Sequence, residues 1–225
     1  MRLSPAPTEF CGPPIRCGKI VCIGQNYREH IKELKGEEPK EPVIFLKPSS
    51  ALIADGEVIQ VPEGVGRVDH EVELALVMGT KGKDIPVEHA LGYVIAVAVF
   101  NDITARDVQS SYRKAGLPWA LSKGMDTFAP MSTPVPLDRV GDLHHLDLEL
   151  RVNGELRQKG NTEQMIFPVE QLIAFISRYM RLEPGDIIAT GTPSGVGPIR
   201  PGDIVEAAIS NVGRLRNPVV EAERR

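Results

Sequence analysis

The pattern of apolar and polar residues predicts a chain of short strands organised around residues 69–79. This stretch reads Asp69-His70-Glu71-Val72-Glu73-Leu74-Ala75-Leu76-Val77-Met78-Gly79. Successive side chains of a strand point to opposite faces. One face then holds Val72, Leu74 and Leu76, and the other holds Glu71, Glu73, Ala75 and Val77. Because both faces become apolar further along the strand, we expect it to be buried on both sides.

Two carboxylates, Glu71 and Glu73, stand where this burial begins. Buried carboxylates repel each other and lose hydration unless a cation or a proton compensates them. A strand end that is still in solvent is the simpler alternative. The next strongly apolar run, residues 93–100, leads directly into Asn101 and Asp102 and adds a third carboxylate. An all-oxygen set of this kind suits a hard divalent cation, Mg²⁺ or Mn²⁺.

The remaining pattern predicts more short strands and three helices. Strands are expected over residues 19–24, 42–48, 58–62, 147–152, 155–157, 185–190, 205–209 and 214–220. The dipeptide Asn153-Gly154 is a strong hairpin signal. Helices are expected over residues 27–35 with Asn26 as N-cap, over 104–115 with Thr104 at the start, and over 167–180 with an apolar stripe against the sheet.

Composition supports a mixed β fold with few helices, of the α+β class. The chain of 225 residues contains 21 glycines and 19 prolines, well above their usual combined share of about 12%, which favours short strands and tight turns. The length fits one domain. We expect an N-terminal arm over residues 1–17 and a single domain over residues 18–225.

Charge and cysteine usage exclude several classes of protein. The net charge is −4, without a basic stripe, so nucleic acid is not an expected partner. The cysteines Cys11, Cys17 and Cys22 lack zinc-site spacing and are expected to be reduced. The N-terminus has no apolar signal region, and no segment approaches the roughly 18 apolar residues of a membrane span. We therefore expect no membrane association and a cytoplasmic location.

Two weaker signals remain open at this point. His30 and Glu33 are i, i+3 neighbours on the first predicted helix, so their side chains can meet, although such a pair often belongs to a solvated face. The glycine-rich loop over residues 191–197 can offer backbone N–H groups to an anion, or can be a plain turn. It lacks the ending of a nucleotide-binding P-loop.

Taken together, the motifs resemble the fumarylacetoacetate hydrolase family, most closely its short acylpyruvase and oxaloacetate decarboxylase branch. The resemblance covers residues 18 to 220, in order. The motifs are Gly24-Gln25-Asn26-Tyr27 with His30 and Glu33, Phe45-Leu46-Lys47-Pro48, His70-Glu71-Val72-Glu73-Leu74, Asn101-Asp102-Ile103-Thr104-Ala105-Arg106-Asp107-Val108-Gln109, Gly116-Leu117-Pro118-Trp119 with Lys123, and Asp186-Ile187-Ile188-Ala189-Thr190-Gly191-Thr192-Pro193-Ser194-Gly195-Val196-Gly197.

The resemblance implies a β-roll around a carboxylate-bound Mg²⁺ or Mn²⁺, in a homodimer. It implies roles for nine residues: metal ligands Glu71, Glu73 and Asp102; a water-activating pair His30 and Glu33; Lys123 beside the developing enolate; and substrate contacts Arg106, Gln109 and Thr192. This chain departs from the family pattern in two places. Gln25 stands where the family commonly has arginine, and Gly124-Met125 stands where it commonly has Ser-Phe.

The implied reaction is Mg²⁺-dependent hydrolysis of a C–C bond in acylpyruvate-type 2,4-dioxo acids, with decarboxylation of oxaloacetate as a second reaction of the same site. An isomerase or decarboxylase of 2-hydroxyhepta-2,4-diene-1,7-dioate type acids, and an oxaloacetate tautomerase, stay open as alternatives. An inert metal-binding protein is disfavoured because His30, Glu33 and Lys123 occur together. The charged segment 26–40 is further expected to act as a lid that brings His30 over the metal when substrate binds.

Overall fold

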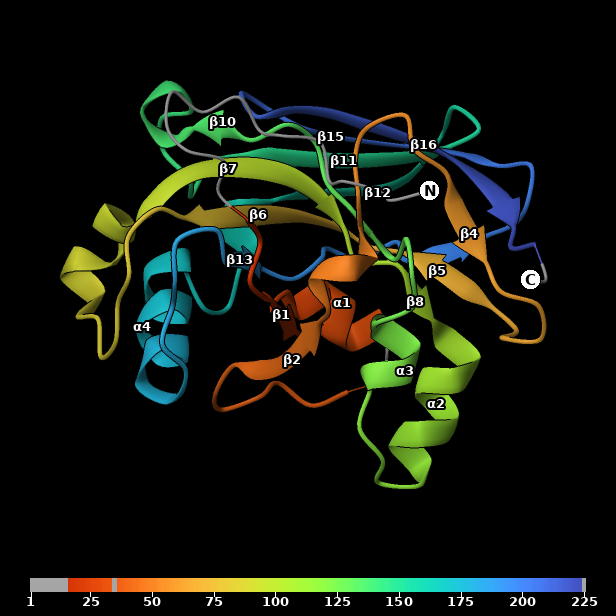
Figure 1. Ribbon diagram of the computed structural model, residues 1–225, viewed down its shortest axis with the longest axis horizontal. Coiled ribbons are helices and arrows are strands. Elements are labelled where there is room, and N and C mark those ends of the chain that lie inside the picture. Colours follow the sequence, from red (N-terminus) through yellow and green to blue (C-terminus); the bar gives the residue numbers. More distant parts are fainter. Residues whose placement is uncertain (1–15, 34–35, 224–225) are drawn as a thin grey trace.

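The structure is a computed structural model that describes residues 16–33 and 36–223 (Figure 1). Most of the predicted N-terminal arm, and Cys11 with it, lies outside the described residues. The two cysteines inside them, Cys17 and Cys22, are free thiols, as expected. Within the described residues, none of the helices has the length and apolar character that crossing a membrane requires.

Short strands dominate the described chain, and the helices are few, as predicted. The strands are β1 Ile20–Gly24, β2 Val43–Lys47, β3 Leu52–Ile53, β4 Ile59–Val61, β5 Val68–His70, β6 Val72–Met78, β7 Val94–Asn101, β8 Thr104–Ala105, β9 Ala129–Pro130, β10 Val135–Pro136, β11 Asp147–Val152, β12 Glu155–Asn161, β13 Ile187–Ala189, β14 Gly197–Ile199, β15 Ile204–Ile209 and β16 Gly213–Glu221. The α-helices are α1 Arg28–Glu33, α2 Arg106–Lys114, α3 Ala120–Lys123 and α4 Val169–Tyr179.

A six-stranded mixed sheet in the order β10-β7-β6-β13-β1-β2 forms the centre of the molecule. Its strand β6 is buried along its whole length, and the predicted alternation of faces is confirmed. Val72, Leu74 and Leu76 belong to the main hydrophobic core. Ala75 faces a second, smaller core on the other side of the sheet. The carboxylates at the start of β6 therefore do enter a buried layer.

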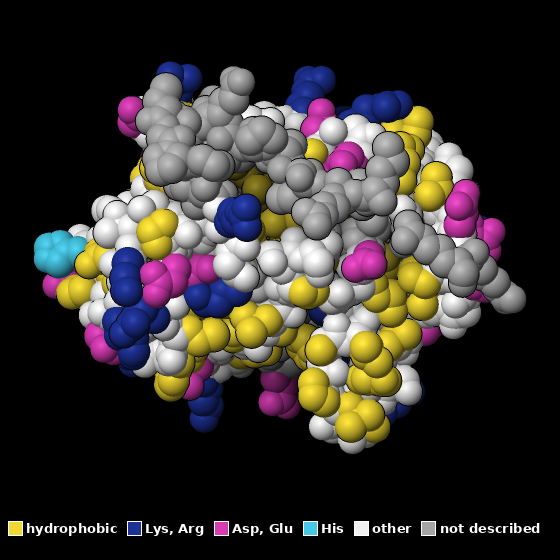
Figure 2. Space-filling model, in the orientation of Figure 1, with side chains coloured by type: hydrophobic (Ala, Val, Ile, Leu, Met, Phe, Trp, Pro, Cys, Tyr) yellow, Lys and Arg dark blue, Asp and Glu magenta, His cyan; other side chains and the backbone are white. Residues whose placement is uncertain are grey.

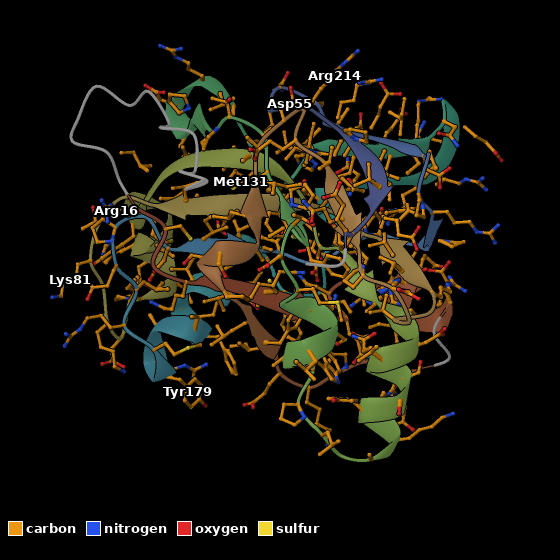
Figure 3. The ribbon with its side chains drawn as sticks, turned by 45° about the vertical axis from the view of Figure 1, so that its right-hand side comes forward. Arg16, Asp55, Lys81, Met131, Tyr179 and Arg214 are labelled. Carbon is orange, nitrogen blue, oxygen red and sulfur yellow. The ribbon has the colours of Figure 1, made fainter. Side chains whose placement is uncertain are left out.

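A five-stranded sheet in the order β12-β11-β15-β16-β4 lies over β6 and β7, and side chains of both sheets fill the main core between them (Figure 1). The predicted hairpin is confirmed between β11 and β12. Asn153 and Gly154 have φ values of 53° and 81°, as a type I′ turn requires. Helix α4 packs beside the six-stranded sheet with its apolar stripe buried, while Tyr179 in its last turn projects outward (Figure 3).

Helices α2 and α3 project from the opposite end (Figures 1 and 3). Helix α2 buries none of its residues. The predicted cap at Thr104 is wrong, because this hydroxyl donates to the Asp102 carbonyl oxygen and α2 begins at Arg106. On the face shown in Figure 2, hydrophobic side chains gather over these two helices. Leu121 in α3 and Leu117 in the segment between the helices are exposed.

The helix that was predicted over residues 27–35 begins one residue later than expected, its predicted end at residues 34–35 lies outside the described residues, and its predicted cap is wrong. Asn26 is fully buried and binds other segments: its amide donates to the carbonyl oxygens of Phe167 and Thr190, and its Oδ1 accepts from the Phe167 N–H. Asn26 therefore fixes the start of α1 against distant parts of the chain, while α1 itself begins at Arg28.

Candidate active site

A cavity of about 200 Å³ lies where the starts of β6 and α2 meet the ends of β7 and α3. The antiparallel pairing of β6 and β7 sets Val72 opposite Asn101. This register brings the first residues of β6 beside the residue that follows β7. The cavity is lined by eight of the nine predicted site residues, namely His30, Glu71, Glu73, Asp102, Arg106, Gln109, Lys123 and Thr192.

The three predicted carboxylates come together at the bottom of this cavity. Glu71, Glu73 and Asp102 are all buried, and one oxygen of each lies within 4.8 Å of the others. The alternative that these carboxylates stand at a solvated strand end is therefore wrong. Their grouping is of the kind that a divalent cation occupies.

Glu71 is tied to two cations. One of its oxygens accepts from Lys123 Nζ at 2.9 Å and the other from the Arg106 guanidinium. Burial alone would raise the pKa of Glu71, but Lys123 and Arg106, helped by His30, hold it well below its usual range. Glu71 therefore carries a full negative charge at neutral pH.

Glu73 has a different environment, although it is only 1% exposed. Its one hydrogen-bond donor within the described chain is the Gly191 N–H, at 2.8 Å. Burial and the neighbouring Asp102 and Glu71 raise the pKa of Glu73 well above its usual range. Gly191 has a φ of 96°, and a side chain there would meet Asn26 at 2.7 Å, so only glycine allows this close approach. The Glu73 charge thus lacks a cation of its own.

Asp102 keeps one oxygen without a hydrogen bond. Its Oδ2 accepts from Lys123 at 2.5 Å. Its Oδ1 lies 2.7 Å from Lys47 Nζ, but that ammonium group donates its hydrogens to the carbonyl oxygens of Ile103, Lys123 and Phe128. Oδ1 therefore receives no donor among the described residues. Burial also lowers the pKa of Lys47.

His30 and Glu33 meet as predicted. His30 Nδ1 lies 3.2 Å from Glu33 Oε2, and the Gly195 N–H donates to the same carboxylate. His30 is 5% exposed and lines the cavity together with the three carboxylates; the role of segment 26–40 as a lid stays a prediction. The glycine-rich loop serves the chain's own anions, because Gly191 binds Glu73 and Gly195 binds Glu33.

Arg106 is held in place by its neighbours. Its guanidinium donates to Asp69 at 2.8 Å, to Gln109 at 2.6 Å and to Glu71. An arginine has five N–H groups, so two remain for a ligand. Lys123 likewise uses two of its three N–H groups on Glu71 and Asp102, and its ammonium lies 4.7 Å from the centre of the Phe45 ring.

The Thr192 hydroxyl is used inside the protein. It donates to the Val72 carbonyl oxygen and accepts from Gln158 Nε2, both at 2.8 Å. Gln158 is fully buried, and its Oε1 lies 2.9 Å from His70 Nδ1. This chain of contacts anchors the glycine-rich loop against β6. The hydroxyl of Thr192 consequently has no hydrogen left to donate to a ligand.

Sequence reasoning missed several residues of this site. Phe45, Trp119, Ser110 and Arg113 line the cavity, whereas Lys47 and Gln158 stand behind the lining. Phe45, Lys47 and Trp119 belong to the motifs quoted above, but no role was predicted for them. Arg113 could have been found from its helical spacing, because residues 106, 109, 110 and 113 share one face of a helix.

Comparison with models of known protein families shows the family to which the chain belongs. Residues 19–220 match the model of the fumarylacetoacetate (FAA) hydrolase C-terminal family. The chain belongs to the fumarylacetoacetate hydrolase family.

Members of this family that resemble the chain have several reactions in their names. The mitochondrial oxaloacetate tautomerase FAHD1 of Arabidopsis thaliana is 48% identical over 207 residues, which is 92% of each chain. The mitochondrial oxaloacetate decarboxylase of Dictyostelium discoideum is 47% identical over 195 residues, covering 86% of this chain and 89% of the relative. The crystal structure of fumarylpyruvate hydrolase from Pseudomonas aeruginosa, in complex with Mn²⁺ and pyruvate, has a TM-score of 0.90 at 33% identity and covers 99% of both chains.

Membership of the fumarylacetoacetate hydrolase family means that the chain belongs to a family of enzymes. Its mostly β, α+β fold is the fold of the solved relatives. The cavity brings together three carboxylates that can hold a divalent cation, a histidine that is backed by a glutamate outside the lining, and two cations with N–H groups to spare. Such a set can bind an anionic oxo acid, stabilise negative charge that develops on it, and move a proton.

Proposed function

We propose that this protein is a divalent-metal-dependent enzyme that cleaves the C3–C4 bond of acylpyruvate-type 2,4-dioxo acids. The observation that carries the proposal is the convergence in one cavity of Glu71, Glu73 and Asp102 with His30 and Lys123. The substrate class follows from the charge pattern, because an anionic oxo acid offers oxygens to a cation and acceptors to Lys123 and Arg106.

The three carboxylates fit a hard cation, Mg²⁺ or Mn²⁺. Glu73 lacks a cationic partner of its own, and Asp102 Oδ1 receives no hydrogen bond within the described chain, so both have oxygen lone pairs to offer. When bound there, the cation would supply Lewis-acid stabilisation of the enolate charge, worth several kcal/mol. The Pseudomonas fumarylpyruvate hydrolase was crystallised in complex with Mn²⁺ and pyruvate, which supports this choice of metal.

His30 takes the role of general base in the hydrolysis. Glu33, whose carboxylate accepts from the Gly195 N–H, holds the Nδ1 side of His30, which leaves Nε2 to accept a proton from water. The hydroxide adds to C4, the C3–C4 bond breaks, and its electron pair remains on the pyruvate fragment as an enolate. His30 then returns its proton to C3, so that pyruvate and a carboxylic acid are the products. Lys123 supports the enolate oxygen with its third N–H.

A second candidate reaction is decarboxylation or tautomerisation of oxaloacetate. The relatives named for these activities, at 47–48% identity, favour it. Loss of CO₂ from oxaloacetate forms the same enolate and needs no attacking water, so the same residues could serve both reactions. The expected homodimer and the cytoplasmic location stay predictions.

The proposal is tested with a substrate panel of acetylpyruvate, oxaloacetate and a hydroxymuconate-type dicarboxylate, each with EDTA-treated enzyme before and after Mg²⁺ is restored. We expect the enzyme to form pyruvate and acetate from acetylpyruvate only when Mg²⁺ is present, with NMR used to monitor both products. If oxaloacetate is the only substrate that is converted, the second candidate reaction takes the place of acylpyruvate hydrolysis as the assigned activity. Isomerisation of the dicarboxylate alone would assign the chain to the isomerases.

A further inference from the structure

The outer part of the cavity contains a cation that the reaction described above does not use. Arg113 lines the cavity from the last turn of α2. Its side chain is exposed and forms no hydrogen bond or ion pair with the described residues 16–33 and 36–223. The two other cationic side chains that line the cavity, Lys123 and Arg106, are already paired with buried carboxylates.

The geometry of α2 sets the distance of Arg113 from the carboxylates. Residues 106, 109, 110 and 113 follow the i, i+3, i+4, i+7 spacing of one helix face, and all four line the cavity. Arg113 stands seven residues after Arg106, about 10 Å further along the helix axis. Side chains of a helix lean toward its N-terminus, so the long side chain of Arg113 reaches back toward Arg106.

A four-carbon dicarboxylic acid matches this arrangement. Its two carboxyl carbons are three C–C bonds apart, about 4 Å when extended. With the 2-oxo acid end at Glu71, Glu73 and Asp102, the second carboxylate lies outward along the α2 face. There it would meet Ser110 and the unpaired guanidinium of Arg113, which can bind a carboxylate with two parallel hydrogen bonds.

We propose that Arg113 is a specificity residue that binds the distal carboxylate of dicarboxylic 2-oxo acids and so favours them over monocarboxylic acylpyruvates. This inference rests on the proposed function, since it needs the 2-oxo acid end at the buried carboxylates. It makes the substrate class more specific: a 2-oxo acid with a second carboxylate near C4. Apolar acyl groups gain nothing from a free guanidinium.

The test compares Arg113→Gln with a matched control, Lys114→Gln. Lys114 is the next residue of α2, is exposed and does not line the cavity, so its variant measures the effect of losing one nearby positive charge. KM and kcat are determined with Mg²⁺ for oxaloacetate, corrected for its spontaneous decarboxylation, and for acetylpyruvate. Arg113→Lys is the conservative variant.

We expect Arg113→Gln to raise KM for oxaloacetate about 10- to 30-fold and to raise kcat rather than lower it, since the lost charge-assisted contact is strongest in the ground state, before the charge of the C4 carboxylate moves to the enolate as CO₂ leaves. In Arg113→Gln, KM for acetylpyruvate should change less than twofold. Lys114→Gln should have the wild-type KM for both substrates. Arg113→Lys should have a KM for oxaloacetate between those of wild type and Arg113→Gln. Equal changes for both substrates, or none, with normal wild-type turnover would overturn this inference alone. A wild-type enzyme that converts neither substrate would overturn the proposed function and this inference with it.

Discussion

Replacing Glu73 by glutamine should stabilise the metal-free protein and reduce the additional stabilisation that a divalent cation gives. The substitution keeps the size of the side chain and an acceptor for the Gly191 N–H, but removes one charge. One carboxylate oxygen of Glu73 lies within 4.8 Å of one oxygen each of Glu71 and Asp102. Two like charges at that separation repel by about 3.5 kcal/mol at an effective dielectric constant of about 20.

Lys123 offsets part of this repulsion, because it contacts both neighbours of Glu73. We therefore expect Glu73→Gln to stabilise the metal-free protein by about 1–3 kcal/mol. For a chain of this size each kcal/mol raises Tm by about 2–4 °C. The EDTA-treated variant should melt several degrees above the EDTA-treated wild type.

The effect of added metal should be reduced by the same substitution. At a Mg²⁺ concentration of about 100 Kd, binding stabilises a protein by about 2.7 kcal/mol. Loss of a residue that only supports a metal ligand already weakens metal sites about 10- to 100-fold, so loss of a ligand carboxylate should weaken binding at least as much. With a 100-fold weaker Kd, the same Mg²⁺ concentration would stabilise the variant by only about 0.4 kcal/mol.

The assay is thermal unfolding in EDTA and across a Mg²⁺ titration, with calorimetry for Kd. Glu183→Gln is the matched control, because Glu183 is a half-exposed carboxylate that faces Lys81 at the surface. The control should behave as wild type in both conditions. A Glu73→Gln variant that melts below wild type in EDTA, or that gains as much from Mg²⁺ as wild type, would refute the reasoning.

Three further substitutions test individual roles. His30→Gln should lower acetylpyruvate hydrolysis by about 10²- to 10⁴-fold, as expected for loss of a general base, but oxaloacetate decarboxylation by much less; equal losses in the two rate assays would contradict this division. Lys123→Met should lower kcat/KM for both substrates at least tenfold, and a change within twofold would argue against its role beside the enolate. Gln158→Leu should destabilise the protein by about 1–3 kcal/mol in urea unfolding, because the hydrogen bonds of a buried amide are lost; an unchanged midpoint would show that the contact with Thr192 contributes nothing.

The sequence predicted those parts of the fold that follow from local patterns. Alternation of apolar residues located β6 and its two faces, and Asn153-Gly154 located a hairpin whose turn requires positive φ. The three carboxylates could be grouped in advance because Glu71, Glu73 and Asp102 stand at the ends of strands that pair with each other. Resemblance to the family supplied the nine proposed roles, and the structure gathers eight of these residues around one cavity.

The sequence could not reveal which of two chemically possible partners a polar side chain takes. Asn26 and Thr104 have the chemistry of helix caps, but tertiary contacts offered Asn26 three backbone partners and offered Thr104 the Asp102 carbonyl oxygen. Lys47 lies in a predicted strand and Gln158 directly follows one, and their contacts at the site come from segments that are far away in the chain. Arg113 differs from Arg106 and Lys123 because those two side chains are already paired with carboxylates. These pairs are visible only in the three-dimensional structure.

The most direct measurement is a crystal structure grown with Mn²⁺ and oxalate, a mimic of the pyruvate enolate, with data collected at the manganese absorption edge. The account predicts one anomalous peak among the carboxylate oxygens of Glu71, Glu73 and Asp102, with oxalate between this ion and the side chains of Lys123 and Arg106. A map without a peak at these carboxylates, at a Mn²⁺ concentration that supports turnover, would contradict it.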